Sequence, residues 1–284
     1  MTVKIVTDST ADFSVEEANA LGVTIVPLTV RFGDESFFDR VDITPEQFYG
    51  RLVTSPVFPQ TSQPATGAFQ EAYAGLAAAG ATEILCITMS SRLSGTLNSA
   101  RLAASEAPAG CRVYTLDSMT VAGGLGAMVE RAANVGQHGG SAEDAAEAAR
   151  LLIPRHRITI LLDTLEYLQK GGRIGKARAL LGGLLNIKPI LEVKDGEVGS
   201  AERVRNRTRG IERVFDKIIA LPEVEQVIVQ HTGAISDAES LATRLRTAFP
   251  GVDVGIKWIG PVVGAYVGPN GVGTVAIERV AGSG

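Results

Sequence analysis

Short apolar runs alternate with segments of helical periodicity along the first half of the chain. The apolar runs, which predict strands, span residues 3–6, 23–30, 84–89 and 111–116. The helical patterns span residues 15–21, 45–52, 96–104 and 121–135. This alternation is typical of βαβ units, so we expect a mainly parallel sheet with helices on its faces.

The pattern changes in the second half, beyond a break that we place between residues 142 and 156. An Asp-Gly pair at 195–196 separates two strand-like runs, 188–193 and 197–204, which is a strong hairpin signal. The other expected elements are strands at 157–163 and 224–230, helices at 208–220 and 237–248, and an end rich in Gly and Val. We therefore predict an N-terminal α/β domain over residues 1–155 and a C-terminal α+β domain over residues 156–284.

Composition narrows the possible partners of this chain. Its 284 residues are 45% hydrophobic and 20% charged, enough for two domains and for an interior ligand cavity. The formal charge is −4 and no long cationic run is present, which argues against nucleic acid as a partner. No stretch approaches the eighteen or so apolar residues of a membrane span, and the N-terminus has the pattern of a strand instead of a signal peptide. We expect a cytoplasmic protein.

The residues that usually bind metals or cofactors are too scattered to predict such a site. Cys86 and Cys111 have no CxxC spacing and are expected to be buried free thiols. His138, His156 and His231 lack the spacing of metal ligands. The glycine-rich segment 171–177 departs from a Walker A loop in its spacing and in its last residue, and 271–276 lies too near the end for a dinucleotide-binding unit. We predict no metal and no cofactor.

Two clusters of hydroxyl residues carry the strongest functional signal. Residues 61–64 read Thr-Ser-Gln-Pro and residues 90–96 read Ser-Ser-Arg-Leu-Ser-Gly-Thr, and each is expected to be a loop that opens onto a helix. Helix N-termini offer unpaired N–H groups and the positive end of a dipole, so such loops suit a carboxylate or phosphate head group. The alternative is that these hydroxyls are ordinary helix N-caps.

These segments and several others resemble the DegV family of bacterial fatty-acid-binding proteins, essentially from end to end. The carriers of the resemblance are residues 7–12 (Thr-Asp-Ser-Thr-Ala-Asp), 61–64, 90–96 with 99–100, 117–118, 165–174, 188–191 and 268–273. So many matches in the same order make the resemblance specific.

The resemblance implies a two-domain α/β protein that holds one long-chain fatty acid, such as palmitate, in an interior tunnel whose mouth lies between the domains. It also implies that the carboxyl is bound by Thr61 and Ser94, with Ser62 beside them. Some family members are the acyl-carrying subunit of a bacterial fatty-acid kinase, in which catalysis belongs to a separate ATP-binding subunit. The chain is then a lipid carrier and not itself an enzyme.

One position departs from the family pattern. Many relatives carry a histidine shortly before the closing Gly-Pro, where this chain has Tyr266. A tyrosine hydroxyl can donate to a carboxylate, but with an ordinary pKa near 10 it stays neutral at pH 7. Tyr266 is therefore a candidate carboxyl-binding residue, and a core tyrosine is the alternative.

Further candidates extend this interpretation. The candidates for lining the tunnel, which would otherwise be ordinary core residues, are Leu93, Leu165, Leu168, Ile187 and Ile190. The candidates for contacting a kinase partner, which would otherwise be solvated cations, are Lys170, Arg173 and Arg203. A second functional class stays open, an enzyme that acts on a small acidic or phosphorylated substrate with Asp8, Asp117 or Ser94 in an interdomain cleft. Lipid chain length, partner identity and oligomeric state are not predicted.

Overall fold

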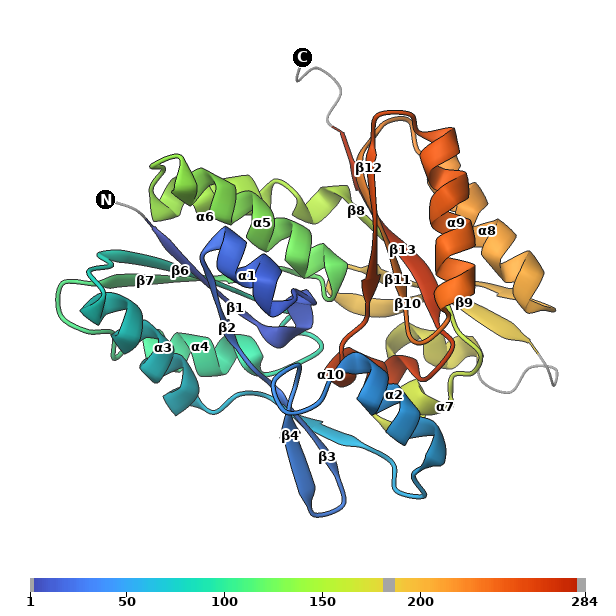
Figure 1. Ribbon diagram of the computed structural model, residues 1–284, viewed down its shortest axis with the longest axis horizontal. Coiled ribbons are helices and arrows are strands. Elements are labelled where there is room, and N and C mark those ends of the chain that lie inside the picture. The colour runs from blue at the N-terminus through green and yellow to red at the C-terminus, as the bar shows by residue number, and fades with distance from the viewer. Residues whose placement is uncertain (1–2, 181–186, 280–284) are drawn as a thin grey trace. The chain divides into compact units, whose positions relative to one another are not determined.

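The chain divides into two units, and the second takes in a segment from early in the sequence. The computed structural model describes residues 3–180 and 187–279 (Figure 1). The first unit comprises Met1–Ile43 and Thr61–Pro154, and the second comprises Thr44–Gln60 and Arg155–Gly284. The domains expected from the sequence, 1–155 and 156–284, assign residues 44–60 differently.

A four-stranded parallel sheet forms the centre of the first unit. Its order is β2 (Val23–Val26), β1 (Lys4–Asp8), β6 (Glu83–Thr88) and β7 (Arg112–Asp117), and all three pairings are parallel. The helices of this unit are α1 (Val15–Leu21), α3 (Thr66–Ala78), α4 (Thr96–Ala104), α5 (Gly123–Gln137) and α6 (Ala142–Arg150), with a short 3-10 helix at Ser9–Ala11. The parallel α/β organisation expected from the alternating pattern is confirmed.

Proline divides the apolar run at residues 23–30, which the pattern treats as one strand. β2 ends at Val26, Pro27 follows, and β3 (Thr29–Phe32) joins a separate sheet. Proline has no N–H to donate to a strand ladder, and the chain leaves the parallel sheet at this point. β3 lies between β4 (Glu35–Phe38) and β5 (Gln60–Ser62) in this second, three-stranded sheet.

The core of the first unit lies between its sheet and helices. All six residues of β6 are buried, and two of them, Ile84 and Cys86, share a cluster with Phe69 and Tyr73 of α3. On α5, Gly126 lies so close to the 3-10 helix that an added Cβ would be 2.7 Å from the carbonyl oxygen of Ala11. The absence of a side chain therefore allows α5 to approach the end of β1.

The second unit contains a six-stranded mixed sheet. Its order is β10 (Glu197–Val204), β9 (Lys188–Lys194), β8 (His156–Leu161), β13 (Val272–Glu278), β11 (Val224–His231) and β12 (Asp253–Trp258). Only β11 and β12 pair in parallel. The hairpin expected at 195–196 joins β9 to β10, and both turn residues have positive φ, 53° at Asp195 and 78° at Gly196, as a type I′ turn requires.

Helices cover the mixed sheet. α8 (Arg207–Ile219) and α9 (Ile235–Ala248) bury Val214, Ile218, Leu241 and Leu245 against its strands. Among the described residues, the unit also contains α2 (Pro45–Thr54), α7 (Glu166–Lys170), α10 (Pro261–Val267) and a 3-10 helix at Gly175–Leu180. A further 3-10 helix, Ile153–Arg155, spans the boundary between the units. The mixed architecture agrees with the α+β organisation expected for the second half.

Candidate functional site

The two hydroxyl clusters both lie in the first unit. Thr61 and Ser62 belong to the short strand β5, which ends four positions before α3 begins at Thr66, whereas the sequence pattern predicts a loop. Ser94 lies in the turn between β6 and α4, as expected. Thr61 and Ser94 are half-buried and Ser62 is exposed.

No hydroxyl side chain of either cluster belongs to the N-cap residue of the helix that follows. The N-cap residues of α3 and α4 are Ala65 and Gly95, and neither has a side-chain capping bond. By contrast, capping boxes begin three other helices at Ser14, Thr44 and Ser141. The alternative of ordinary capping is therefore wrong for Thr61 and Ser62. Ser94 makes local bonds, with its Oγ 2.8 Å from Thr96 Oγ1 and accepting from the Thr96 N–H at 3.3 Å.

The turn that carries Ser94 is held from both sides by carboxylates at the ends of neighbouring strands. At the end of β1, Asp8 accepts a 2.8 Å hydrogen bond from the N–H of Met89. At the end of β7, Asp117 accepts bonds from the N–H groups of Ser91 at 3.2 Å and Met119 at 3.0 Å. These bonds fix the start of the turn and indicate a structural role for both carboxylates, which the enzyme alternative treats as catalytic groups.

Asp8 is fully buried, and its carboxyl oxygens accept hydrogen bonds from nearby donors. Burial raises the pKa of this carboxyl above its ordinary value, while hydrogen bonds from Thr10 and Met89 act in the opposite direction. The Thr10 hydroxyl and N–H both donate to Asp8 Oδ1, at 2.5 and 3.0 Å. The carboxyl thereby joins the end of β1 to the turn after β6.

Gln63 brings the two hydroxyl clusters together. Its Nε2 donates a 2.9 Å hydrogen bond to Ser99 Oγ, on the buried side of α4. Its amide also lies over Gly95, where a Cβ would be 2.1 Å from Gln63 Oε1. Gln63 is thus in contact with the start of α4, at the residue that follows Ser94 in the chain. The sequence pattern gives no role to Gln63 or Gly95, because their contact joins segments more than thirty residues apart.

The other candidate residues of the site belong to the second unit. Tyr266 of α10 packs against the cluster formed by Leu162, Leu165, Leu168, Ile174, Ala177 and Leu191. The guanidinium of Arg173 lies 5.2 Å from the centre of the Tyr266 ring, a cation–π arrangement. The structure therefore joins one predicted carboxyl-binding residue to one predicted partner-contact residue.

The three predicted partner-contact cations are exposed, and each has a local contact. Lys170 Nζ pairs with Glu166 at 2.6 Å and lies 5.6 Å from the Phe58 ring centre. Arg173 donates to the Gly171 carbonyl at 3.0 Å, and Arg203 donates to the Ala179 carbonyl at 2.9 Å. These contacts orient the cations and leave them accessible.

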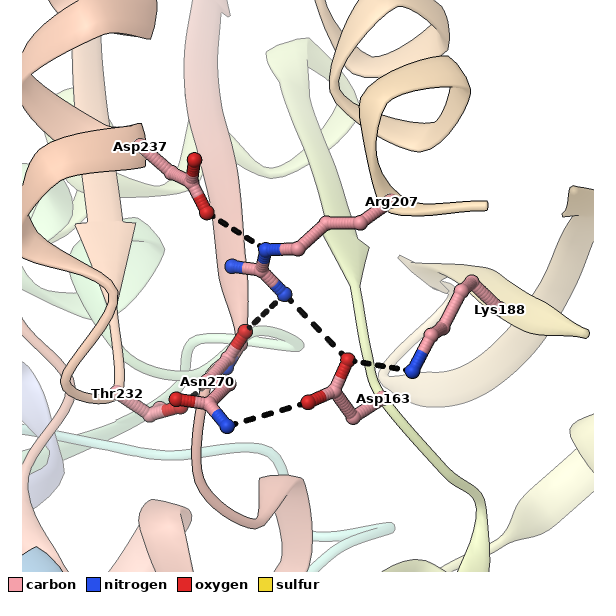
Figure 2. A network of polar contacts seen from close by, with 7 residues as sticks. Asp163, Lys188, Arg207, Thr232, Asp237 and Asn270 are labelled. Carbon is pink, nitrogen blue, oxygen red and sulfur yellow. Dashed lines mark hydrogen bonds and ion pairs between the residues drawn. The ribbon is translucent and has the colours of Figure 1, made fainter. Parts of the chain in front are cut away.

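A polar network fixes the loop that follows Tyr266 (Figure 2). Asp163, after β8, accepts hydrogen bonds from Lys188 at 2.8 Å and from Asn270 at 3.2 Å. Arg207, at the start of α8, donates to the Asn270 carbonyl at 2.7 Å and pairs with Asp237 at 2.6 Å. Burial opposes ionisation of Asp163, but its hydrogen bonds to Lys188 and Asn270 and the nearby positive charges hold its pKa below the ordinary value.

The five predicted tunnel-lining residues do not share one cluster. Leu165 and Leu168 lie in the cluster beside α7, whereas Ile190 packs in the cluster beneath α8 and α9. Ile190 and Leu191 point to opposite faces of β9, as neighbours in a strand must. Leu93 and Ile187 are half-buried in different units. The lining assignments stay predictions.

Comparison with known proteins shows the family to which this chain belongs. The model of the DegV family, described as an uncharacterised protein family, matches residues 2–279. The chain belongs to the DegV family. A DegV domain-containing protein of Deinococcus radiodurans is 38% identical to it, over 98% of this chain and 99% of that protein.

Solved DegV structures share the whole fold. A DegV family protein from Thermus thermophilus, described for its fatty acid binding, is 32% identical, with a TM-score of 0.91 over 98% of this chain and all of that chain. The fatty acid kinase B3 protein of Streptococcus pneumoniae, loaded with linoleic acid, is 22% identical, with a TM-score of 0.83 over 98% of this chain and 99% of that chain. The second likeness shows the fold alone.

Neither a helix suited to crossing a membrane nor a metal-binding cluster occurs among the described residues. Among residues 3–180 and 187–279, no helix combines the length and apolar character that a membrane crossing needs. Over the same ranges, no three His, Cys, Asp or Glu residues gather in a way that could hold a metal ion. Cys86 and Cys111 are both free and buried, as expected, and burial raises the pKa of Cys86 to about 12.

Proposed function

We propose that this DegV protein binds one long-chain fatty acid, such as palmitate, in an interior tunnel and holds the carboxyl through Thr61 and Ser94. The observation that carries the proposal is the contact between the two hydroxyl clusters, made by Gln63 and Gly95. No hydroxyl of either cluster belongs to the N-cap residue of the helix that follows. The fatty acid binding of the similar protein from Thermus thermophilus supports the same ligand class.

The two ends of such a ligand contribute differently to binding. Burying a methylene group stabilises by roughly 0.8 kcal/mol, so about fourteen of them in a C16 chain give on the order of 11 kcal/mol before the ordering costs. A hydrogen bond from a hydroxyl to an ionised carboxyl adds about 1.5–3 kcal/mol. The tail therefore supplies most of the affinity, and the hydroxyls set the orientation of the lipid by binding its carboxyl end.

Substitution of both hydroxyls tests the carboxyl assignment. In the variant Thr61→Ala with Ser94→Ala, we expect palmitate to bind about tenfold or more weakly and its carboxyl to move from its wild-type position. Isothermal titration measures the first effect, and a crystal structure with bound palmitate measures the second. Unchanged affinity together with an unchanged carboxyl position in the double variant contradicts the assignment of Thr61 and Ser94.

We further propose that the chain presents its lipid to a separate ATP-dependent kinase subunit, which supplies the catalysis. The shared fold of the pneumococcal fatty acid kinase B3 protein supports this role, as do the exposed cations Lys170, Arg173 and Arg203 of the second unit. Tyr266, in contact with Arg173, is proposed to complete the head-group site with its hydroxyl. The proposal assigns this chain to lipid transport and presentation.

A further inference from the structure

Gln63 joins β5 to α4 through one hydrogen bond and one close steric contact. The hydrogen bond runs from Gln63 Nε2 to Ser99 Oγ at 2.9 Å, and Ser99 is only 4% exposed. The steric contact is with Gly95, whose backbone leaves room for the Gln63 amide only because it carries no side chain. A Cβ at residue 95 would lie 2.1 Å from Gln63 Oε1 and 2.8 Å from its Cδ.

The extended backbone around Gln63 relates the direction of the Thr61 side chain to that of the Gln63 side chain. β5 covers Gln60–Ser62, and the N-cap Ala65 is also extended, with φ −65° and ψ 153°. Pro64 confines the residue before it, Gln63, to extended conformations. Side chains two positions apart in an extended chain point to the same side, so Thr61 shares the side of Gln63.

The contact between Gln63 and Gly95 also constrains Ser94. Ser94 precedes Gly95 directly, and its N–H donates to the Ser90 carbonyl at 3.2 Å within a turn that Asp8 and Asp117 already anchor. The turn is therefore fixed at its start by carboxylates and at its end by the Gln63 amide.

We propose that Gln63 is a positioning residue that, by its hydrogen bond to Ser99 and its contact with Gly95, sets Thr61 beside Ser94 and thereby makes the site selective for a carboxylate over an uncharged lipid head. This inference rests on the proposed function. It assigns head-group selectivity to a residue that binds no ligand atom itself.

The test uses Gln63→Met, which keeps the length of the side chain but removes the amide, and Ser99→Ala, which removes only the acceptor. Binding of palmitate and of hexadecanol to the delipidated protein is measured at pH 7.4 for wild type, for both variants and for their combination. We expect each variant to bind palmitate about tenfold more weakly, the combination to be no worse than either alone, and hexadecanol affinity to change less than twofold.

A spectroscopic reading separates positioning from general loss of structure. The carboxyl signal of bound [1-¹³C]palmitate is followed by NMR against pH in wild type and in both variants. Hydrogen bonds to the ionised carboxyl lower its pKa, so displacement of Thr61 from Ser94 should move the titration of the bound lipid to higher pH.

Gln70→Met is the matched control. Gln70 lies in α3, and its Nε2 donates to Glu106 just beyond α4, outside the hydroxyl clusters. We expect this variant to keep wild-type palmitate affinity and the wild-type titration. Gly95→Ala is a second test, in which residue 63 is not substituted. The added methyl group overlaps the Gln63 amide and should displace it, so palmitate binding should weaken and hexadecanol binding should not.

The outcomes separate the two proposals. Wild-type protein that binds no palmitate overturns the proposed function itself. Wild-type protein that binds palmitate, with both variants equal to it in affinity and titration, overturns only the role of Gln63. Equal losses of palmitate and hexadecanol in both variants also overturn that role, because they indicate general damage instead of head-group selectivity.

Discussion

The Tyr49 hydroxyl donates a 3.0 Å hydrogen bond to the carbonyl of Ile259, 210 positions later in the chain. The Tyr49 ring also stacks on Trp258, with 5.8 Å between the ring centres, and Trp258 in turn contacts His231 at 4.3 Å. These contacts explain why α2, encoded within the first sixty residues, belongs to the second unit.

Gly264→Ala should loosen this attachment. A Cβ at residue 264 would lie 2.3 Å from the Tyr49 hydroxyl oxygen and 3.0 Å from the Phe48 ring, both buried. We expect a loss of about 1–3 kcal/mol in the free energy of unfolding, measured by urea denaturation. Gly255→Ala is the control, since nothing lies within 4 Å of its added Cβ, and it should change stability by less than about 0.5 kcal/mol. Equal stability of the two variants would contradict this packing.

His231 should make the stability of the protein depend on pH. Burial lowers the pKa of this imidazole, although the charges of Glu46 and Glu239 act in the opposite direction. The unfolded chain then binds a proton more readily than the folded chain, so stability should fall as pH drops from about 6.5 towards the folded pKa. An NMR titration of the imidazole signals should place the His231 pKa below its ordinary value. A pKa above that value would contradict the burial argument.

Asp163→Asn should weaken the polar network that fixes Asn270. The charge of Asp163 is stabilised in the folded state, so its contribution is present above the ordinary aspartate pKa of about 3.9 and is lost as pH falls through the lower folded value. At pH 7 the variant should be less stable than wild type by about 1 kcal/mol, a modest figure because the pair with Lys188 is partly exposed. The difference should shrink as the pH of the denaturation experiment is lowered below 3.9. A difference that stays constant over this range would contradict the ionised role of Asp163.

Arg173→Glu should weaken association with a fatty-acid kinase subunit. The variant reverses an exposed charge beside Tyr266, and Arg209→Glu makes the same change in net charge at an exposed position of α8. Association is measured by surface plasmon resonance with palmitate-loaded protein. We expect Arg173→Glu to bind the kinase at least tenfold more weakly than Arg209→Glu. Normal association of Arg173→Glu would remove this residue from the proposed contact surface.

The local pattern predicts much of the fold, because many elements begin or end at residues with a clear chemical signal. The expected helices at 15–21 and 96–104 coincide with α1 and α4, and the Asp-Gly hairpin lies where it is expected. Pro27 is also visible in the sequence, and its effect on the run at 23–30 follows from its missing N–H. Short elements such as α7 and β4 carry too little periodicity to be predicted.

The candidate site is predicted in part. The two hydroxyl clusters are visible in the sequence, and the resemblance to the family singles out Thr61 and Ser94 within them. Gln63, however, contacts a glycine and a serine at the start of a helix that lies more than thirty positions away. The assignment of α2 to the second unit likewise depends on contacts of Tyr49 that span 210 positions. Such contacts depend on tertiary packing, which local periodicity does not encode.

Mass spectrometry of the purified protein tests most directly whether this chain is a fatty-acid carrier. The protein is measured under native conditions as purified and after delipidation and addition of palmitate, and the released ligand is identified under denaturing conditions. We predict one C14–C18 fatty acid per chain as purified, and one palmitate per chain after reloading. Protein that carries no lipid in either state, and that instead consumes a small phosphorylated metabolite, would contradict the account.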